Sequence, residues 1–247
     1  MRLTVLGACG AWPEPQQACS GFLVEHDGFR LVLDLGYATV PRLLSHVDPG
    51  QIDAVVISHG HPDHCADLNP LLRSRALSDD PPAPLPVYAP PGALDAVLAL
   101  DRKEMLAGSY LVHDVVPGTS LSIGPFEVDT RLLPHWLPNL GVRLTAAGRS
   151  LAYTGDSGPS QEVVNLAQNA DLLLAEATHL DPVAADVRQY MSSPSVAGRQ
   201  AAAAGVGRVL LTHLWPGTDR AQALAQASAQ YSGDLGVAVA DLSVDLH

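Results

Sequence analysis

The sequence predicts an α/β protein in which helices cover the outer faces of two packed sheets. The sequence contains short apolar runs typical of strands and longer stretches typical of helices. Their order along the chain is strands and then helices, and this order occurs twice. With 247 residues, the chain is long enough for one large domain with a sizeable core. We expect residues 1–247 to form a single domain, because no linker or internal repeat interrupts them.

The first half of the chain contains a predicted hairpin and a buried strand. Asp27-Gly28 is a tight-turn signal between two strands, and Leu94 and Val97 are near helical spacing. Residues 78–91 are rich in proline and form a loop around one short strand. The elements expected here are strands at 3–7, 21–25, 29–34, 54–57 and 87–89, and helices at 39–46, 67–77 and 92–106.

The second half begins with successive strands and ends with strands that alternate with helices. Pro117-Gly118 and Gly124-Pro125 are turn signals between the strands. Ser193 or Ser195 is the expected N-cap of an alanine-rich helix, and Gly205 ends this helix. The expected elements are strands at 112–116, 120–123, 126–133, 140–144, 150–154, 171–175, 209–212 and 237–240, and helices at 160–168, 193–204 and 220–231.

Residues 58–64 follow a buried strand and read Ser-His-Gly-His-Pro-Asp-His. Imidazoles and carboxylates at this density suit zinc or a similar metal, and the aspartate favours a hydrolytic site over a closed structural one. His59 and His61 project from the end of the strand, whereas Asp63 and His64 lie where a helix begins. Two pairs of ligands that point in different directions indicate two metal ions.

Three further polar residues, His135, Asp156 and His213, stand where predicted strands end. Taken singly, each is also explained as a polar residue that closes a strand. Together with the histidine motif, they complete a set of ligands for two metals. The first metal would be bound by His59, His61 and His135, and the second by Asp63, His64 and His213, with Asp156 bridging the two.

The composition argues against several classes of protein. Fourteen basic and 26 acidic residues give a net charge of −12, and the arginines are scattered, so we expect no long nucleic acid as a partner. No stretch approaches the ~20 apolar residues of a membrane span, and the strand-like N-terminus is too short for a signal peptide. Three cysteines without a CxxC pair argue against a disulfide framework. We expect a cytoplasmic protein with a small, anionic substrate and no membrane partner.

The motif at 59–64, together with His135, the run Thr-Gly-Asp-Ser-Gly at 154–158 and the pair Thr-His at 212–213, resembles the motifs of metallo-β-lactamase-fold hydrolases. The resemblance covers nearly the whole chain. It implies a four-layer αββα sandwich with the metals at one edge between the sheets. The run Ala-Glu-Ala-Thr at 175–178 is similar to a segment of the branch that contains ribonuclease Z and cyclic-nucleotide phosphodiesterases.

The resemblance implies a hydrolase with a dinuclear metal site and a bridging hydroxide. Aspartate, and not cysteine, at position 156 favours phosphoester chemistry. The compact form of the chain, including the run His-Cys-Ala-Asp-Leu at 64–68, most resembles enzymes that hydrolyse 3′,5′-cyclic nucleotides, so such a nucleotide is the expected substrate. The expected cofactors are two divalent ions, with zinc preferred and manganese or iron also compatible with these ligands. Members of the family that resemble this chain are commonly dimers, so we expect a homodimer.

The resemblance also assigns catalytic roles. Asp63 is expected to accept or steer the proton of the attacking hydroxide, and Glu176 or His179 to protonate the leaving group. This branch usually pairs a histidine with the glutamate, but the aligned residue here is Met191, whose side chain cannot donate a proton. His179 is the candidate substitute, and the alternative is a solvent-exposed loop histidine.

Aromatic and acidic residues near the motifs have two interpretations each. Trp12 and Trp136 would stack on a flat part of the substrate, with Trp215 as a further candidate, or they would only pack the loops beneath the site. Asp34 and Asp67 would orient ligand imidazoles or would cap local structure.

Three other functions remain open from the sequence. The same metals would serve hydrolysis of a lactone, a thioester or another acyl compound, and Met191 fits a pocket that is less adapted to phosphate. A tRNA 3′-processing endonuclease is disfavoured by the net charge and by the absence of a basic or Gly-Pro-rich arm. A non-catalytic metal-binding protein is disfavoured because the sequence contains all seven ligands of the predicted site.

Overall fold

The computed structural model describes residues 1–102 and 104–247. The strands are β1 (Arg2–Cys9), β2 (Ala18–Cys19), β3 (Gly21–His26), β4 (Phe29–Leu35), β5 (Ala54–Val56), β6 (Leu85–Ala89), β7 (Tyr110–Asp114), β8 (Ser120–Ile123), β9 (Phe126–Leu133), β10 (Asn139–Ala146), β11 (Arg149–Tyr153), β12 (Leu172–Glu176), β13 (Arg208–Thr212), β14 (Asp234–Val237) and β15 (Ser243–Asp245). The helices are α1 (Thr39–Leu43), the 3-10 helix η1 (Pro49–Gln51), α2 (Pro62–Cys65), α3 (Leu68–Ala76), α4 (Asp95–Leu98), α5 (Gln161–Leu166), α6 (Pro194–Ala204) and α7 (Arg220–Ser228).

The strands form two mixed sheets. The first has the order β15-β1-β3-β4-β5-β6-β7, with β2 beside β1, and the second has the order β14-β13-β12-β11-β10-β9-β8. Each sheet is antiparallel where hairpins join its strands, as in β3–β4 and β9–β10, and parallel in the run β4–β7 or β11–β14. The parallel pairs require crossovers, and most of the helices lie in these crossovers.

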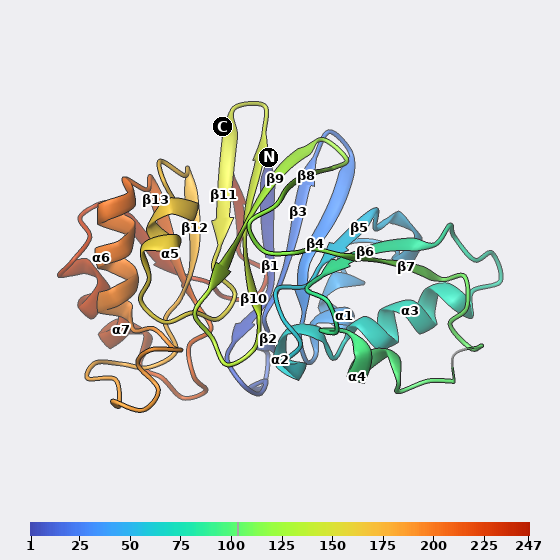
Figure 1. The fold of residues 1–247 in the computed structure, drawn as a ribbon, viewed down its shortest axis with the longest axis horizontal. Helices are drawn as coiled ribbons and strands as arrows, with labels where there is room; N and C mark the ends of the chain where they lie inside the picture. The colour runs from blue at the N-terminus through green and yellow to red at the C-terminus, as the bar shows by residue number, and fades with distance from the viewer. Residues whose placement is uncertain (103) are drawn as a thin grey trace.

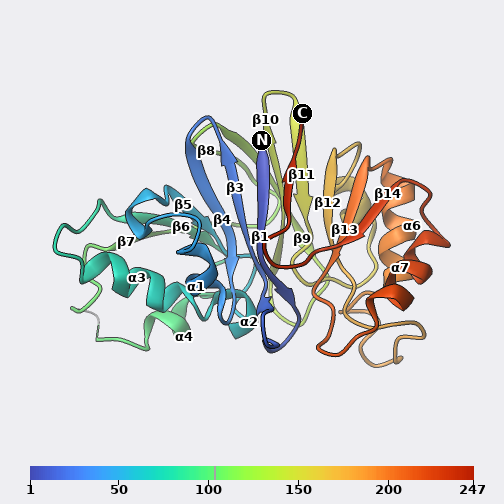
Figure 2. The same ribbon diagram turned by 180° about the vertical axis from the view of Figure 1, so that it is seen from behind.

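Buried apolar side chains form three layers. The middle layer lies between the two sheets and includes Phe22 and Tyr153, whose ring centroids are 5.2 Å apart. A second layer, with Leu43 and Leu71, fills the space between the first sheet and helices α1, α3 and α4. A third, with Leu166, lies beneath α5, α6 and α7. Figures 1 and 2 show the two helix groups on opposite sides of the sheets, so the predicted four-layer αββα sandwich is confirmed.

The loops that carry the predicted ligands leave the two sheets at one edge. Strands β9 and β11 are both antiparallel to β10, and β13 runs parallel to β12 and β11, so these strands end on the same side. The three remaining ligands follow within three positions of the ends of β9, β11 and β13, and they are His135, Asp156 and His213. Helix α2, which begins within the histidine motif, lies at this edge between the sheets, at the bottom of Figure 1.

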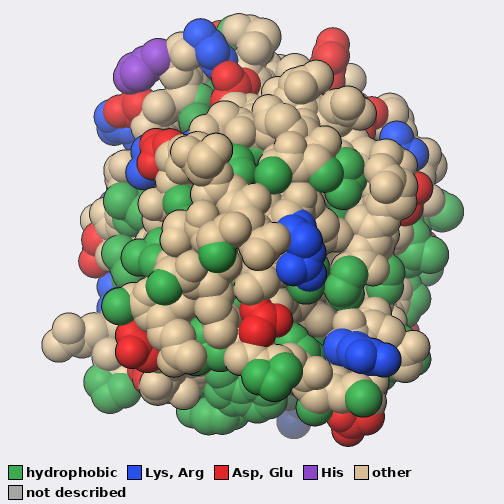
Figure 3. Space-filling view, turned by 90° about the vertical axis from the view of Figure 1, so that its left-hand side faces the viewer, with side chains coloured by type: hydrophobic (Ala, Val, Ile, Leu, Met, Phe, Trp, Pro, Cys, Tyr) green, Lys and Arg blue, Asp and Glu red, His purple; other side chains and the backbone are tan. Residues whose placement is uncertain are grey.

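The surface features agree with the composition. Figure 3 shows the face formed by helices α6 and α7, where basic side chains stand singly and do not gather into a patch. Within the described ranges, no helix has the length and apolar character that crossing a bilayer would require.

The predicted helix at 92–106 is wrong over most of its length. Only α4, four residues long, is helical, and Lys103 lies outside the described residues. The Asp101 carboxylate accepts hydrogen bonds from Asn69 Nδ2 at 2.8 Å and Arg73 Nη1 at 2.6 Å, both on α3. These bonds hold the chain in a turn against α3. The apolar residues Leu94 and Val97, whose spacing predicted a long helix, therefore lie at the start and within a single helical turn.

The predicted strand at 237–240 is also displaced. Strand β14 ends at Val237, because the chain then leaves the second sheet and crosses to the first. Asp241 N donates to Val5 O at 2.8 Å, and Val5 N donates to Leu242 O at 2.9 Å. This crossing leads into β15, which pairs with β1 and was not expected from the sequence.

Candidate metal centre

The histidine motif forms a tight strand–loop–helix connection. His61 is the N-cap of α2 and has extended backbone angles, and Pro62 occupies the first helical position, as the sequence predicts. Gly36, which follows β4, packs against the backbone of this helix. A Cβ atom at Gly36 would lie 1.9 Å from Asp63 O, so only glycine allows β4 and α2 to approach this closely.

All seven predicted metal ligands meet at this edge. They form two groups of four side chains that share Asp156, and within each group the potential ligand atoms all lie within 4.8 Å of one another. The sequence placed one histidine after β9 and another after β13, and the sheets bring both to the motif at the end of β5. The first group is His59, His61, His135 and Asp156, and the second is Asp63, His64, His213 and Asp156.

The two oxygens of Asp156 face different groups. Oδ2 lies 3.8 Å from His59 Nε2 and 3.8 Å from His135 Nε2. Oδ1 lies 3.1 Å from His64 Nε2 and 3.3 Å from His213 Nε2. One carboxylate therefore has an oxygen available to each group, as the bridging role predicted for Asp156 requires.

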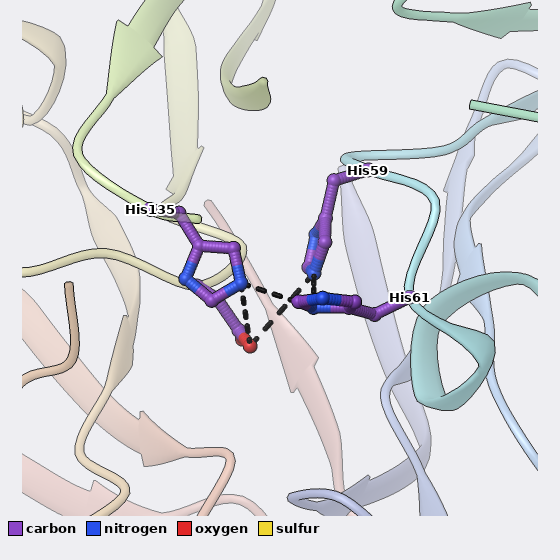
Figure 4. A group of neighbouring side chains, drawn as sticks. His59, His61 and His135 are labelled. Atoms are coloured by element: carbon purple, nitrogen blue, oxygen red, sulfur yellow. Dashed lines mark hydrogen bonds and ion pairs between the residues drawn. The ribbon is translucent and has the colours of Figure 1, made fainter. Parts of the chain in front are cut away.

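The donor atoms in these groups fit divalent cations. His61 Nδ1 lies 3.0 Å from both His59 Nε2 and His135 Nε2, so three ring nitrogens converge on one point (Figure 4). In the second group, His64 Nε2 and Asp156 Oδ1 are buried and have no hydrogen-bond partner among the described residues. Buried polar atoms normally have a partner, and a bound cation would supply one here. Nitrogen and carboxylate oxygen donors are the ligands that zinc and similar ions bind.

The electrostatics of the site favour bound positive charge. Burial lowers the pKa of His59, His61 and His135, so these imidazoles are neutral, which is the state that binds a metal. Burial alone would raise the pKa of Asp156, but the imidazoles of His213 and His64 outweigh it and hold the pKa well below the ordinary value. The shared carboxylate is therefore ionised.

Asp34 orients one of the ligands. This fully buried carboxylate lies 2.7 Å from His64 Nδ1, and it accepts hydrogen bonds from Ser58 N at 2.6 Å and from the Tyr153 hydroxyl at 2.6 Å. His64 Nδ1 donates to Asp34, so its Nε2 is directed at the metal position. Of the two acidic residues left open by the sequence, Asp67 instead accepts from Val40 N at 2.8 Å, at the start of α1.

Glu176 reaches the second group through Thr178. The Thr178 hydroxyl donates to Glu176 Oε1 at 2.5 Å and lies 2.8 Å from His213 Nδ1, from which it accepts. Ser192 N donates to Glu176 Oε2 at 2.8 Å, and burial raises the pKa of Glu176 to about 7. Met191 is itself buried, and Glu176, which the resemblance pairs with a histidine, is paired here with the backbone amide of the next residue.

The predicted substrate residues lie at the surface next to the ligands. Trp12 is 47% exposed, and its neighbour Ala11 donates its backbone N–H to Asp63 Oδ2 at 2.8 Å. Trp136 is 51% exposed and packs with a ring-centroid distance of 5.1 Å on the ligand His135. His179 is not among the grouped ligands, and its ring contacts Trp215 with centroids 4.6 Å apart.

Two residues that contact the site were not predicted from the sequence. Tyr190 packs on Trp136 with ring centroids 5.1 Å apart, and Thr178 links Glu176 to His213. Thr178 belongs to the Ala-Glu-Ala-Thr run, so its spacing of two from the glutamate could have identified it. Tyr190 lies in an irregular loop and has no such signal.

Comparisons with known proteins agree with this site. Residues 14–214 match the family described as Beta-lactamase superfamily domain. The uncharacterized protein ML1173 of Mycobacterium leprae is 33% identical over 100% of this chain and 89% of its own length. Ribonuclease Z of Mycolicibacterium paratuberculosis is 28% identical over 100% of this chain and 97% of its own length.

A solved structure supports the same assignment. The probable metallo-hydrolase YhfI of Bacillus subtilis is 30% identical over 87% of each chain. The crystal structure of YhfI, described as a metallo-β-lactamase fold protein, superposes with a TM-score of 0.90 and 27% identity over 99% of both chains. On its fold, its clustered histidines and aspartates and these relatives, the chain belongs to the β-lactamase superfamily and is a metallo-hydrolase of the metallo-β-lactamase fold.

Proposed function

We propose that this protein hydrolyses small phosphodiesters at a pair of divalent ions, with zinc as the preferred metal and a 3′,5′-cyclic nucleotide as a suitable substrate. The observation that carries the proposal is the orientation of Asp156, whose Oδ1 faces His64 and His213 while Oδ2 faces His59 and His135. When bound, the two ions would neutralise phosphate charge and lower the pKa of a water at the site.

Asp63 is suited to steer the proton of the attacking water. Its Oδ2 accepts from Ala11 N at 2.8 Å and lies 3.1 Å from His213 Nε2. Burial alone would raise the pKa of Asp63, but the hydrogen bond from His213 and the charge of His64 outweigh it, and the pKa falls below the ordinary value. An ionised carboxylate at this place can accept a proton or orient the water by a hydrogen bond.

Glu176 and His179 were the two candidates for assisting the leaving group. The carboxylate of Glu176 is buried and already accepts hydrogen bonds from Thr178 and Ser192, so we assign to it the positioning of His213. His179 is partly exposed beside Trp215, and burial lowers its pKa. A neutral imidazole there would stabilise the leaving oxygen by donating a hydrogen bond from its ring N–H.

The relatives support phosphoester chemistry. One relative is a ribonuclease Z, and its name denotes an enzyme that acts on a nucleic acid. The present chain has a net charge of −12, so a small phosphodiester suits it better than a long nucleic acid. Acyl hydrolysis is the second candidate, because Met191 removes the imidazole that the resemblance implied beside Glu176.

A metal-reconstituted assay with two substrates tests the proposal. Bis(p-nitrophenyl) phosphate and p-nitrophenyl acetate are compared with the wild type, with Asp156→Ala, and with Asp114→Ala as an exposed control on β7. We expect diester turnover that is lost in Asp156→Ala together with at least one metal, and kept in Asp114→Ala. Turnover of the acetate alone would establish acyl hydrolysis in its place. Two bound metals and full activity in Asp156→Ala would refute the assignment of the site.

A further inference from the structure

All three tryptophans of the protein lie beside the metal ligands and are exposed. The exposed fractions are 47% for Trp12, 51% for Trp136 and 36% for Trp215. Tryptophan is highly buried on average, and each exposed indole leaves a large apolar surface in water. Because packing of the core does not explain these three positions, their common location points to a ligand.

Trp12 and Trp215 form a platform next to the second group of ligands. Their ring centroids are 5.8 Å apart with the planes at 71°, and the His179 ring extends the platform from Trp215. The platform is tied to the site by Ala11, which precedes Trp12 and donates to Asp63 Oδ2 at 2.8 Å. We call Trp12, Trp215 and His179 the Trp12 platform.

Trp136 forms a separate platform next to the first group. Its ring centroid lies 5.1 Å from that of the ligand His135 and 5.1 Å from that of Tyr190. His135 belongs to the first group, whereas Asp63, which anchors the Trp12 platform, belongs to the second. The two platforms therefore adjoin different groups of ligands, and Asp156 belongs to both groups. We call Trp136 and Tyr190 the Trp136 platform.

A phosphodiester has two ester arms, and both extend from the phosphorus atom that must lie at the ligand set. We propose that each platform binds a flat ring on one arm, so that the preferred substrate is a small diester with a ring at both ends, such as a linear dinucleotide. This inference rests on the proposed phosphodiesterase function. A 3′,5′-cyclic nucleotide has one base and would use only one platform. Stacking tolerates different bases, because every base has a flat face.

Two diesters with the same leaving group test the inference. Thymidine 5′-(p-nitrophenyl phosphate) has a ring on each arm, whereas methyl p-nitrophenyl phosphate has only the nitrophenyl ring. In both compounds p-nitrophenolate is the leaving group and the other ester group is an alkyl ester, so their intrinsic reactivities are similar. The enzymes are the wild type, Trp12→Ala, Trp136→Ala, the ring-retaining Trp12→Phe and Trp136→Phe, and Leu111→Ala, which removes an exposed apolar side chain on β7.

We expect the wild type to prefer the two-ring substrate by roughly tenfold or more in kcat/KM, since stacking on one aromatic side chain is worth about 1–3 kcal/mol. Each alanine variant should lower kcat/KM for that substrate by about tenfold. Only one of the two alanine variants should lower kcat/KM for the one-ring substrate, because this substrate has a ring for one platform only. The phenylalanine variants should lose less, and Leu111→Ala should match the wild type. Equal use of both substrates by the wild type, or a two-ring preference that depends on one tryptophan alone, would overturn the inference.

A binding measurement separates this inference from the proposed function. Calorimetric titration with the phosphorothioate of dithymidine, and with thymidine methyl phosphorothioate, needs no turnover. Tighter binding of the dinucleotide that weakens about tenfold in both Trp12→Ala and Trp136→Ala supports two platforms even if no diester is hydrolysed. Equal affinity for both compounds overturns the inference even if diesters are hydrolysed.

Discussion

The Thr178 hydroxyl lies 2.8 Å from His213 Nδ1, and it connects this metal ligand to the buried carboxylate of Glu176. The hydroxyl donates to Glu176 and so must accept from the imidazole. This fixes the proton on Nδ1 and leaves the lone pair of Nε2 for a metal. The same arrangement occurs at His64, where Asp34 accepts from Nδ1 directly at 2.7 Å.

Replacement of Thr178 by valine keeps the shape of the side chain and removes the hydroxyl. We expect metal affinity at the second group to fall by about 10- to 100-fold, the usual effect of losing a partner that orients a ligand. Affinity is measured by competition with a chelator, and Thr119→Val, at an exposed threonine before β8, serves as the control. Unchanged metal affinity in Thr178→Val would show that the hydroxyl does not orient His213.

Replacement of Tyr153 by phenylalanine tests the support of Asp34. The Tyr153 hydroxyl donates at 2.6 Å to this buried carboxylate, and a hydrogen bond to a charged group contributes about 1.5–3 kcal/mol. Tyr231→Phe is the matched variant, because the Tyr231 hydroxyl donates only to neutral carbonyls, Val206 O at 2.8 Å and Gly207 O at 3.0 Å. A hydrogen bond between neutral groups is worth about 0.5–1.5 kcal/mol. Denaturant unfolding should therefore show the larger loss for Tyr153→Phe, and the reverse order would contradict the role of Asp34.

The sequence predicts the metal ligands better than it predicts the hydrogen bonds that orient them. Three of the ligands, His135, Asp156 and His213, each follow an apolar run in the sequence. Strands that run in the same direction end at one edge of a sheet, so the positions of these residues after predicted strands indicate that they meet. The hydrogen bond that supports Asp34 joins residues far apart in the chain. Asp34 and Tyr153 are 119 positions apart, and no local pattern indicates that their side chains meet across two facing sheets.

The failures of prediction have a common cause. Helical spacing at Leu94 and Val97 was a local signal, and the hydrogen bonds from α3 to Asp101 were not visible in it. The end of β14 likewise depends on the hydrogen bonds that Asp241 N and Leu242 O form with Val5, near the opposite end of the chain. In both places a tertiary contact overrides the local preference of the segment.

Metal binding should weaken as the pH falls. Burial alone would lower the pKa of His64 and His213, but Asp156 and the other carboxylates nearby outweigh it, so the pKa of both histidines is raised in the metal-free protein. Protons therefore compete with the metal already above pH 6.5, and they compete more strongly at lower pH. Zinc titrations at pH 8, 7 and 6 should show falling affinity and release of protons on binding. An affinity that is constant over this range would contradict the raised pKa values.

The three cysteines should be unreactive in the folded protein. Cys9, Cys19 and Cys65 are at most 5% exposed, and burial raises the pKa of Cys9 to about 11 and that of Cys65 to about 12. The reactive form is the thiolate, which these groups do not provide at neutral pH. A thiol reagent at pH 8 should label none of them in the native state and all three in denaturant. Because Cys65 directly follows the ligand His64 on α2, labelling that appears only after metal removal would show that the ions hold this helix in place.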